Sequence, residues 1–159
     1  MSLASVEKQF EEEKLDLKVI LLEQSSATVP LAAAALGVEP NRIAKTMAFK
    51  VAEESVLVVT AGEGRIDNKK YKEFFGTKAK MLKADEVLEI TGHPVGGVCP
   101  FGLKEPMKVY LDETLKVFDY VYPAGGTPNS AVKIGVEELE KVTNGVWTSV
   151  CKDAEEIEN

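Results

Sequence analysis

The segment Ala44-Lys45-Thr46-Met47-Ala48-Phe49-Lys50-Val51 decides how the centre of this chain folds. Its side chains alternate between two faces, with Lys45, Met47 and Phe49 on one of them, which is the period of a β-strand. A polar turn over residues 52–55 and an apolar run over residues 56–60 follow, so the sequence predicts a β-hairpin. Lys45 lies between apolar neighbours. We therefore expect its stem to lie against the core and its ammonium to emerge at the edge of a pocket, although an ordinary amphipathic strand lysine would have the same pattern.

Helix signals lie on both sides of this hairpin. Thr28 predicts the start of a helix that Gly37 ends, and Asp67 predicts the start of one that Gly76 ends. Because strands and short helices interleave without a regular βαβ rhythm, we expect an α+β fold, with a mixed sheet curled toward a barrel and helices outside. The remaining predicted elements are helices at 6–14, 85–92 and 136–142, and strands at 17–22, 78–82, 108–111, 116–121, 131–134 and 146–151.

The composition is that of an ordinary globular protein. We expect one domain over residues 1–159, with its core at about 20–151, since 45% of the 159 residues are apolar. No apolar run approaches the ~18 residues that span a bilayer, and no secretory signal is visible, so we expect a cytoplasmic protein without a membrane partner. Two cysteines form no disulfide framework.

Charge is unevenly distributed along the chain. The net charge of −7 argues against non-specific binding to nucleic acid. Only Asp67 and Glu73 oppose a basic window, however, whose members are Arg65, Lys69, Lys70, Lys72, Lys78, Lys80 and Lys83. The window is either a local patch that contacts phosphates or a solvated helix face.

Reactive side chains are scarce. With one histidine and two cysteines, zinc sites built from four cysteines, or from two cysteines and two histidines, are impossible, and we expect no metal and no cofactor. His93 follows a helix end and precedes Pro94, where we expect it to cap carbonyls or to be solvated. Cys99 is either a nucleophile activated by nearby N–H groups or a small residue that fits its loop, and Cys151 is a packing residue.

Two glycine-rich loops stand out, at residues 96–102 and 124–130. Glycine allows the backbone to approach a ligand closely, so the two loops predict a pocket whose walls donate backbone N–H groups.

Four blocks of sequence resemble the YbaK/prolyl-tRNA synthetase-associated domain family, and they occur in that family's order. They cover roughly residues 20–150 and read Arg42-Ile43-Ala44-Lys45-Thr46-Met47-Ala48-Phe49-Lys50, Arg65-Ile66-Asp67-Asn68-Lys69-Lys70, Pro94-Val95-Gly96-Gly97-Val98-Cys99-Pro100-Phe101-Gly102 and Ala124-Gly125-Gly126-Thr127-Pro128-Asn129-Ser130. The resemblance implies a barrel-like mixed sheet and an enzyme that hydrolyses a wrong, small amino acid from transfer RNA, mainly tRNA for proline. It also implies the acceptor end of tRNA, and prolyl-tRNA synthetase, as partners.

The resemblance also implies a site. Lys45 matches the family's essential lysine, and we expect it to be the catalytic residue. The expected substrate-binding residues are Gly96, Gly97, Val98, Cys99, Pro100, Gly102, Gly125, Gly126 and Asn129, and the expected tRNA contacts are Arg65, Lys69, Lys70 and Lys72. Asn129 stands where the alanine-editing branch of the family has a histidine, and Cys99 stands where small residues or proline are common, so the rejected amino acid stays open.

Two other functions remain compatible with the sequence. The same pocket could hold an aminoacyl end or a synthetase without hydrolysing anything, which would make the chain a binding module. Alternatively, Cys99 could serve a thiol or thioester hydrolase.

Overall fold

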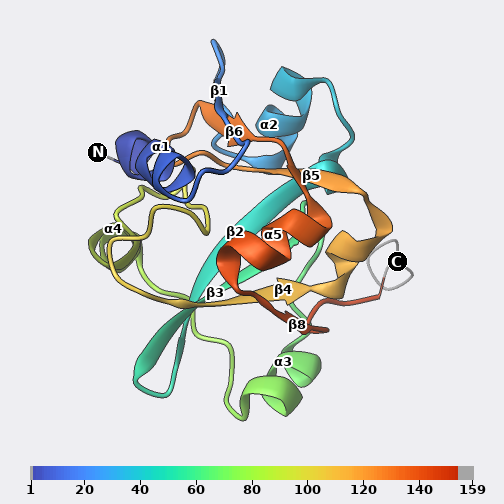
Figure 1. Cartoon of the computed structure of the whole chain (residues 1–159). Helices are drawn as coiled ribbons and strands as arrows, with labels where there is room; N and C mark the ends of the chain where they lie inside the picture. Colours follow the sequence, from blue (N-terminus) through green and yellow to red (C-terminus); the bar gives the residue numbers. More distant parts are fainter. Residues whose placement is uncertain (1, 154–159) are drawn as a thin grey trace.

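Two β-sheets organise the chain in the computed structural model, which describes residues 2–153 (Figure 1). The strands are β1 (Val19–Leu21), β2 (Ile43–Val51), β3 (Glu54–Ala61), β4 (Lys108–Asp112), β5 (Tyr120–Pro123), β6 (Ser130–Val132), β7 (Ile134–Gly135) and β8 (Val146–Thr148). The larger sheet has the order β7-β5-β2-β3-β4-β8, and β1 pairs with β6 in the smaller one. Parallel pairs β2–β5, β3–β4 and β4–β8 stand beside antiparallel pairs β2–β3 and β5–β7, so the larger sheet is mixed.

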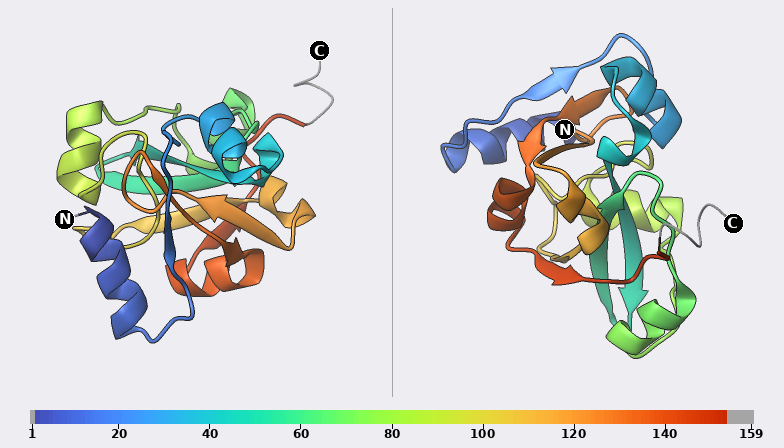
Figure 2. Two further views of the ribbon diagram at one scale, coloured as in Figure 1. Left: turned by 90° about the horizontal axis from the view of Figure 1, so that it is seen from above. Right: turned by 90° about the vertical axis from the view of Figure 1, so that its right-hand side faces the viewer.

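Helices surround this sheet, which curls into a half-barrel (Figure 2). They are α1 (Ser2–Glu12), α2 (Val29–Leu36), α3 (Asn68–Phe75), α4 (Ala84–Thr91) and α5 (Val136–Thr143), with the 3-10 turns η1 (Pro40–Arg42) and η2 (Glu113–Val117). The expected fold class, a curled mixed sheet with helices outside, is thereby confirmed.

The hairpin of β2 and β3 buries both of its faces. Leu57 and Val59 of β3 join one apolar cluster, to which α1, α4 and α5 also contribute. Val58 joins a second cluster on the other face, where Tyr71 of α3 covers it. The alternation predicted for β2 is confirmed, since Ala48 belongs to the first cluster and Phe49 to the second. Figure 1 shows α3 at the end of the molecule far from α1 and α2.

Local capping signals specify two of the helices as predicted. The Thr28 hydroxyl accepts a hydrogen bond from the Leu31 N–H, and Gly37 ends α2 with φ +68°. The Asp67 carboxylate accepts bonds from the N–H groups of Lys69 and Lys70, and Gly76 ends α3. These caps depend on neighbours in the sequence, and for this reason sequence reasoning finds them.

Three strand predictions are wrong in their extent; a local cap explains the first, and long-range contacts explain the other two. The strand expected at 116–121 is replaced by η2 and then β5, because the Asp112 carboxylate accepts a bond from the Thr114 N–H and turns the chain. The strand expected at 131–134 is divided, since β6 pairs with β1 whereas β7 pairs with β5. The strand expected at 146–151 ends at Thr148, beyond which Cys151 makes an isolated bridge to Ile66.

Further corrections concern the ends of elements. The chain at 78–82 makes one isolated bridge, between Met81 and Phe49, in place of a strand. The helix expected to start at Asp85 instead has its N-cap at Lys83, whose N–H donates to the Glu86 carboxylate. Helix α1 begins at Ser2 instead of residue 6, because the Ser2 hydroxyl donates to the Gly126 carbonyl and anchors the first turn.

Candidate active site

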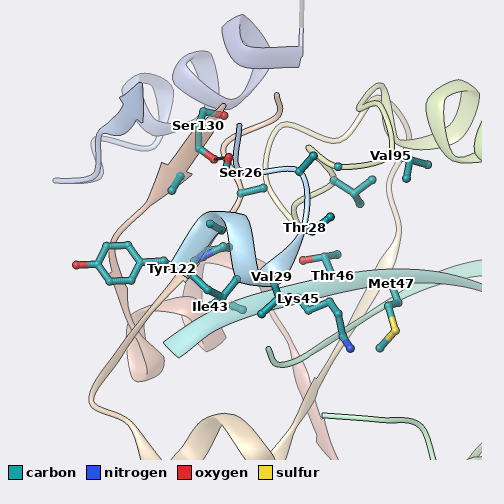
Figure 3. Close-up of a pocket in the computed structure, with 18 of the residues that line it drawn as sticks. Ser26, Thr28, Val29, Ile43, Lys45, Thr46, Met47, Val95, Tyr122 and Ser130 are labelled. Carbon is teal, nitrogen blue, oxygen red and sulfur yellow. Dashed lines mark hydrogen bonds between the residues drawn. The ribbon is translucent and has the colours of Figure 1, made fainter. Parts of the chain in front are cut away.

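A cavity of about 390 Å³ opens at one edge of β2 (Figure 3). Helix α2, the loop around Gly96, and the chain at Ala124 and Ser130 form its other sides. Its lining is mainly apolar, and Lys45 is the one charged residue among the described residues that line it. The cavity therefore suits a ligand whose inserted part is mainly apolar and whose anionic part can reach Lys45.

The cavity exists because β2 lacks a neighbouring strand over part of its length. On one side β2 pairs with β3 from Ala44 to Val51. On the other side it pairs with β5 only at Ile43 and Ala44, and the next neighbour is the single bridge from Phe49 to Met81. The intervening edge, residues 45–47, borders the cavity, so a ligand there meets side chains from both faces of the strand.

Lys45 is half-buried on this free edge. Its Nζ donates a 2.7 Å hydrogen bond to the Gly64 carbonyl, and its side chain leaves β2 on the side opposite to Thr46 (Figure 3). Burial lowers the pKa of the Lys45 ammonium below its usual 10.5, the positive charge of Arg65 lowers this pKa further, and Cys151 acts in the opposite direction. An ammonium has three N–H donors, so Lys45 can bind an anionic oxygen while it keeps Gly64.

The first glycine loop contributes only part of its predicted residues to the cavity. Gly96 and Val98 line it, and Gly96 has φ +95°. Gly97 faces the second loop instead, since a Cβ atom there would lie 2.7 Å from the Thr127 backbone.

The rest of the first glycine loop packs away from the cavity. Gly102 packs against the backbone of α1, where its N–H donates to Gln9 at 2.6 Å. The other two, Cys99 and Pro100, are buried outside the lining.

His93 and Cys99 lie together in the core, away from the cavity. Of the two expectations for His93, the solvated one is wrong, because the side chain is fully buried; its Nε2 lies 2.7 Å from the Phe101 carbonyl. Burial lowers the pKa of His93 and raises the pKa of the Cys99 thiol to about 12. Although the Cys99 sulfur lies 3.7 Å from His93 Nε2, a buried neutral thiol is a poor nucleophile.

The second glycine loop borders the cavity through its flanks. Ala124 and Ser130 line the cavity, whereas Gly125, Gly126 and Asn129 do not. Gly126 lies against the backbone of α1, and Asn129 donates to the Leu22 carbonyl across a 3.4 Å contact. The loop therefore holds Ala124 and Ser130 in the cavity wall, although its own central residues do not line the cavity.

The basic window lies on and near α3. Arg65, Lys69 and Lys72 are exposed. Lys70 donates 2.9 Å hydrogen bonds to the Cys151 carbonyl and to the Asp153 carboxylate. Its positive charge is therefore partly neutralised by an acidic group of the same chain. Arg65 directly follows Gly64, the residue whose carbonyl accepts from Lys45, which connects the window to the cavity.

Sequence reasoning missed most of the helix side of the cavity. The missed lining residues include Ala27, Thr28 and Val29, at or just before the start of α2, and Thr46 on β2. Thr28 was visible as a helix cap and Thr46 as the neighbour of Lys45, but which residues border a cavity depends on long-range pairing that the sequence does not display.

Residues 2–153 lack two further kinds of functional element. They contain no group of three or more histidine, cysteine and acidic side chains arranged to hold a metal ion. None of the described helices has the length and apolar character needed to cross a membrane.

Comparison with known proteins identifies the family. The model of the aminoacyl-tRNA editing domain matches residues 23–142. The uncharacterized protein YwhH of Bacillus subtilis is 48% identical over 98% of this chain and 100% of its own length. An Enterococcus faecalis protein named "Putative Cys-tRNA(Pro)/Cys-tRNA(Cys) deacylase EbsC" is 28% identical over 74% of this chain and 73% of its own.

A solved structure has the same fold. It is described as a "putative trans-editing enzyme for prolyl tRNA synthetase", with a TM-score of 0.89 and 31% identity over 96% of this chain and 98% of that one. The matched region contains β2 with Lys45, the free edge of that strand and both glycine loops. This chain belongs to the aminoacyl-tRNA editing domain family.

Proposed function

We propose that this protein is an aminoacyl-tRNA deacylase, which acts in trans on a small, uncharged amino acid esterified to tRNA, and that the tRNA is the one for proline. One observation carries the proposal: the cavity at the free edge of β2 combines a single cation with mainly apolar walls. Membership of the editing-domain family supports a hydrolytic activity. The printed names of two relatives refer to tRNA for proline and to prolyl-tRNA synthetase, which supports this tRNA as the substrate and this synthetase as a partner. The proposed editing domain comprises the whole chain, residues 1–159.

The chemistry needs no strong nucleophile. An aminoacyl ester is activated, so water can attack its carbonyl with help from the neighbouring ribose hydroxyl. Backbone N–H groups of the loop at Gly96 and Val98 would stabilise the oxyanion, an interaction worth about 3 kcal/mol in other enzymes. The ribose oxygen leaves with the proton that water gives up, and the products are the free amino acid and tRNA.

Lys45 has a defined role in this proposal. Its ammonium is fixed by Gly64 and oriented toward the anionic part of the substrate, the phosphate or the polarised ester oxygen. The predicted substrate-binding residues Gly97, Gly125 and Gly126 would act indirectly, by holding the loops in place behind the residues that line the cavity. Selection by size alone supplies only ~1–3 kcal/mol per methylene, which favours alanine, cysteine or smaller analogues over larger residues.

A panel of mischarged tRNAs tests the proposal. The expected result is release of a small amino acid from at least one of them, tRNA for proline included, at equal rates by the wild-type protein and by Cys99→Ala. Activity that disappears in Cys99→Ala would instead support the thioester hydrolase. Inertness toward every member of the panel, with binding retained, would contradict the proposal and favour the non-catalytic binding module.

A further inference from the structure

Four serine and threonine hydroxyls line the cavity, and three of them already have hydrogen bonds. Ser26 Oγ donates to the Ser130 carbonyl, Thr28 Oγ1 accepts from Leu31, and Ser130 Oγ is bonded to Thr127. Thr46 is the exception, since its buried Oγ1 has no hydrogen-bond partner among the described residues. An unpaired buried hydroxyl costs free energy, so a partner supplied by a ligand would be stabilising.

The backbone of Thr46 faces the same space. Ala48 C=O and Lys50 N–H bond to the chain at Leu82 and Lys80, on the side of β2 away from β3. Backbone groups of a strand alternate between its two edges, so the N–H and C=O of Thr46 point to that side too. Within residues 2–153, no strand pairs with this side of β2 at Thr46, and the cavity lies there instead. Rotation about χ1 to another staggered position would be needed to turn the hydroxyl toward this edge.

The charge of the lining decides which ligand group belongs here. An aminoacyl ester carries an α-amino group that is largely protonated near neutral pH. No aspartate or glutamate lines the cavity among the described residues, so neutral oxygens must receive this cation. Thr46 offers two of them, Oγ1 and the main-chain carbonyl, whereas Lys45 leaves the strand on the opposite side and would repel it.

We propose that Thr46 binds the α-amino group of the substrate's amino acid, while Lys45 binds the anionic part across the edge of β2. This inference rests on the proposed function and deepens it, since it defines the direction in which the substrate lies. The amino group lies on the Thr46 side of the strand, the ester crosses the edge, and the nucleotide lies toward Lys45. Thr46 would then be required for recognition of every aminoacyl ester that the protein accepts.

Thr46→Val tests this role, because valine keeps the β-branched shape and removes the hydroxyl. We expect kcat/KM for aminoacyl-tRNA to fall about 10- to 100-fold, the usual cost of an unpaired charged hydrogen bond, and Thr46→Ser to retain most of the activity. Thr148→Val is the matched control, since Thr148 Oγ1 is also buried without a partner in the described residues but lies outside the cavity. Neither valine variant should lower the melting temperature.

A second arm identifies the substrate group. N-acetylation removes the positive charge and leaves the α-nitrogen one N–H, so Thr46→Val should cause a clearly smaller loss with N-acetylaminoacyl-tRNA than with aminoacyl-tRNA. An equal loss with both substrates, or wild-type kcat/KM in Thr46→Val, would overturn the inference. If the wild-type protein hydrolyses no aminoacyl-tRNA, the proposed function fails. Thr46 is then tested by calorimetry with amide-linked 3′-alanylamino-3′-deoxyadenosine, where binding equal to wild type in Thr46→Val would contradict the inference.

Discussion

At the scale of single residues, we propose that the groups at the edge of β2 bind the substrate, whereas the buried histidine, His93, maintains the structure. Its Nε2–H donates to the Phe101 carbonyl, while its buried Nδ1 has no partner in the described chain. Protonation would add a donor with no acceptor, and burial lowers the pKa of His93 below its usual 6.5. The histidine is therefore neutral and structural.

His93 predicts how stability depends on pH. Below about pH 6.5 the unfolded chain takes up a proton that the folded chain refuses, so the free energy of unfolding should fall as the pH falls. We expect a loss of about 1 kcal/mol between about pH 7.5 and 5.5, measured by urea unfolding. His93 is the one histidine of the chain, so His93→Gln should abolish the loss in this range. The same loss in His93→Gln would contradict this assignment.

At the scale of elements, the site is a gap in strand pairing. Alternation predicts β2 and Lys45 from the sequence, because a period of two is a local property. The free edge is not predictable in this way, since it depends on β5 pairing only with Ile43 and Ala44. The glycine loops show the same limit. Their glycines predict close approach, but the approach is partly of one loop to the other, at Gly97 and Thr127.

Gly97→Ala tests that packing of the two loops. The new Cβ would lie 2.7 Å from three backbone atoms of Thr127, so the loops must separate. We expect the free energy of unfolding to fall by about 1–3 kcal/mol, measured by urea unfolding. Gly135→Ala is the control, because its Cβ would meet only the Asp119 carbonyl at 3.6 Å, and its cost should stay below about 1 kcal/mol. Equal losses in both variants would contradict this packing.

At the scale of the whole molecule, the curled mixed sheet and the capped helices follow from patterns that the sequence contains. Strand partners do not, as the divided segment of β6 and β7 shows. Charge is also a whole-molecule property: in this acidic chain the exposed Arg65 directly follows Gly64, the partner of Lys45, and the exposed Lys69 and Lys72 lie on α3, which comes next in the chain. We propose that this side of the molecule contacts the acceptor stem.

The salt dependence of tRNA binding tests this orientation. Each lysine that contacts a phosphate releases counterions, so Lys69→Ala with Lys72→Ala should reduce the slope of log K against log salt by about 1–2. Lys8→Ala with Lys18→Ala changes the net charge equally at exposed positions on and just after α1, far from α3, and should leave the slope unchanged. If the two double variants have the same slope, the window is a solvated helix face.

The most direct test of the central claim is the single-turnover rate at which this protein releases amino acid from a mischarged tRNA, compared between Lys45→Ala and Lys50→Ala. The two lysines lie on the same strand, but only Lys45 lines the cavity, and Lys50 is exposed. We predict that Lys45→Ala lowers the rate by at least about 100-fold with its melting temperature maintained, whereas Lys50→Ala matches wild type. A wild-type rate in Lys45→Ala would contradict the claim that the free edge of β2 is the hydrolytic site.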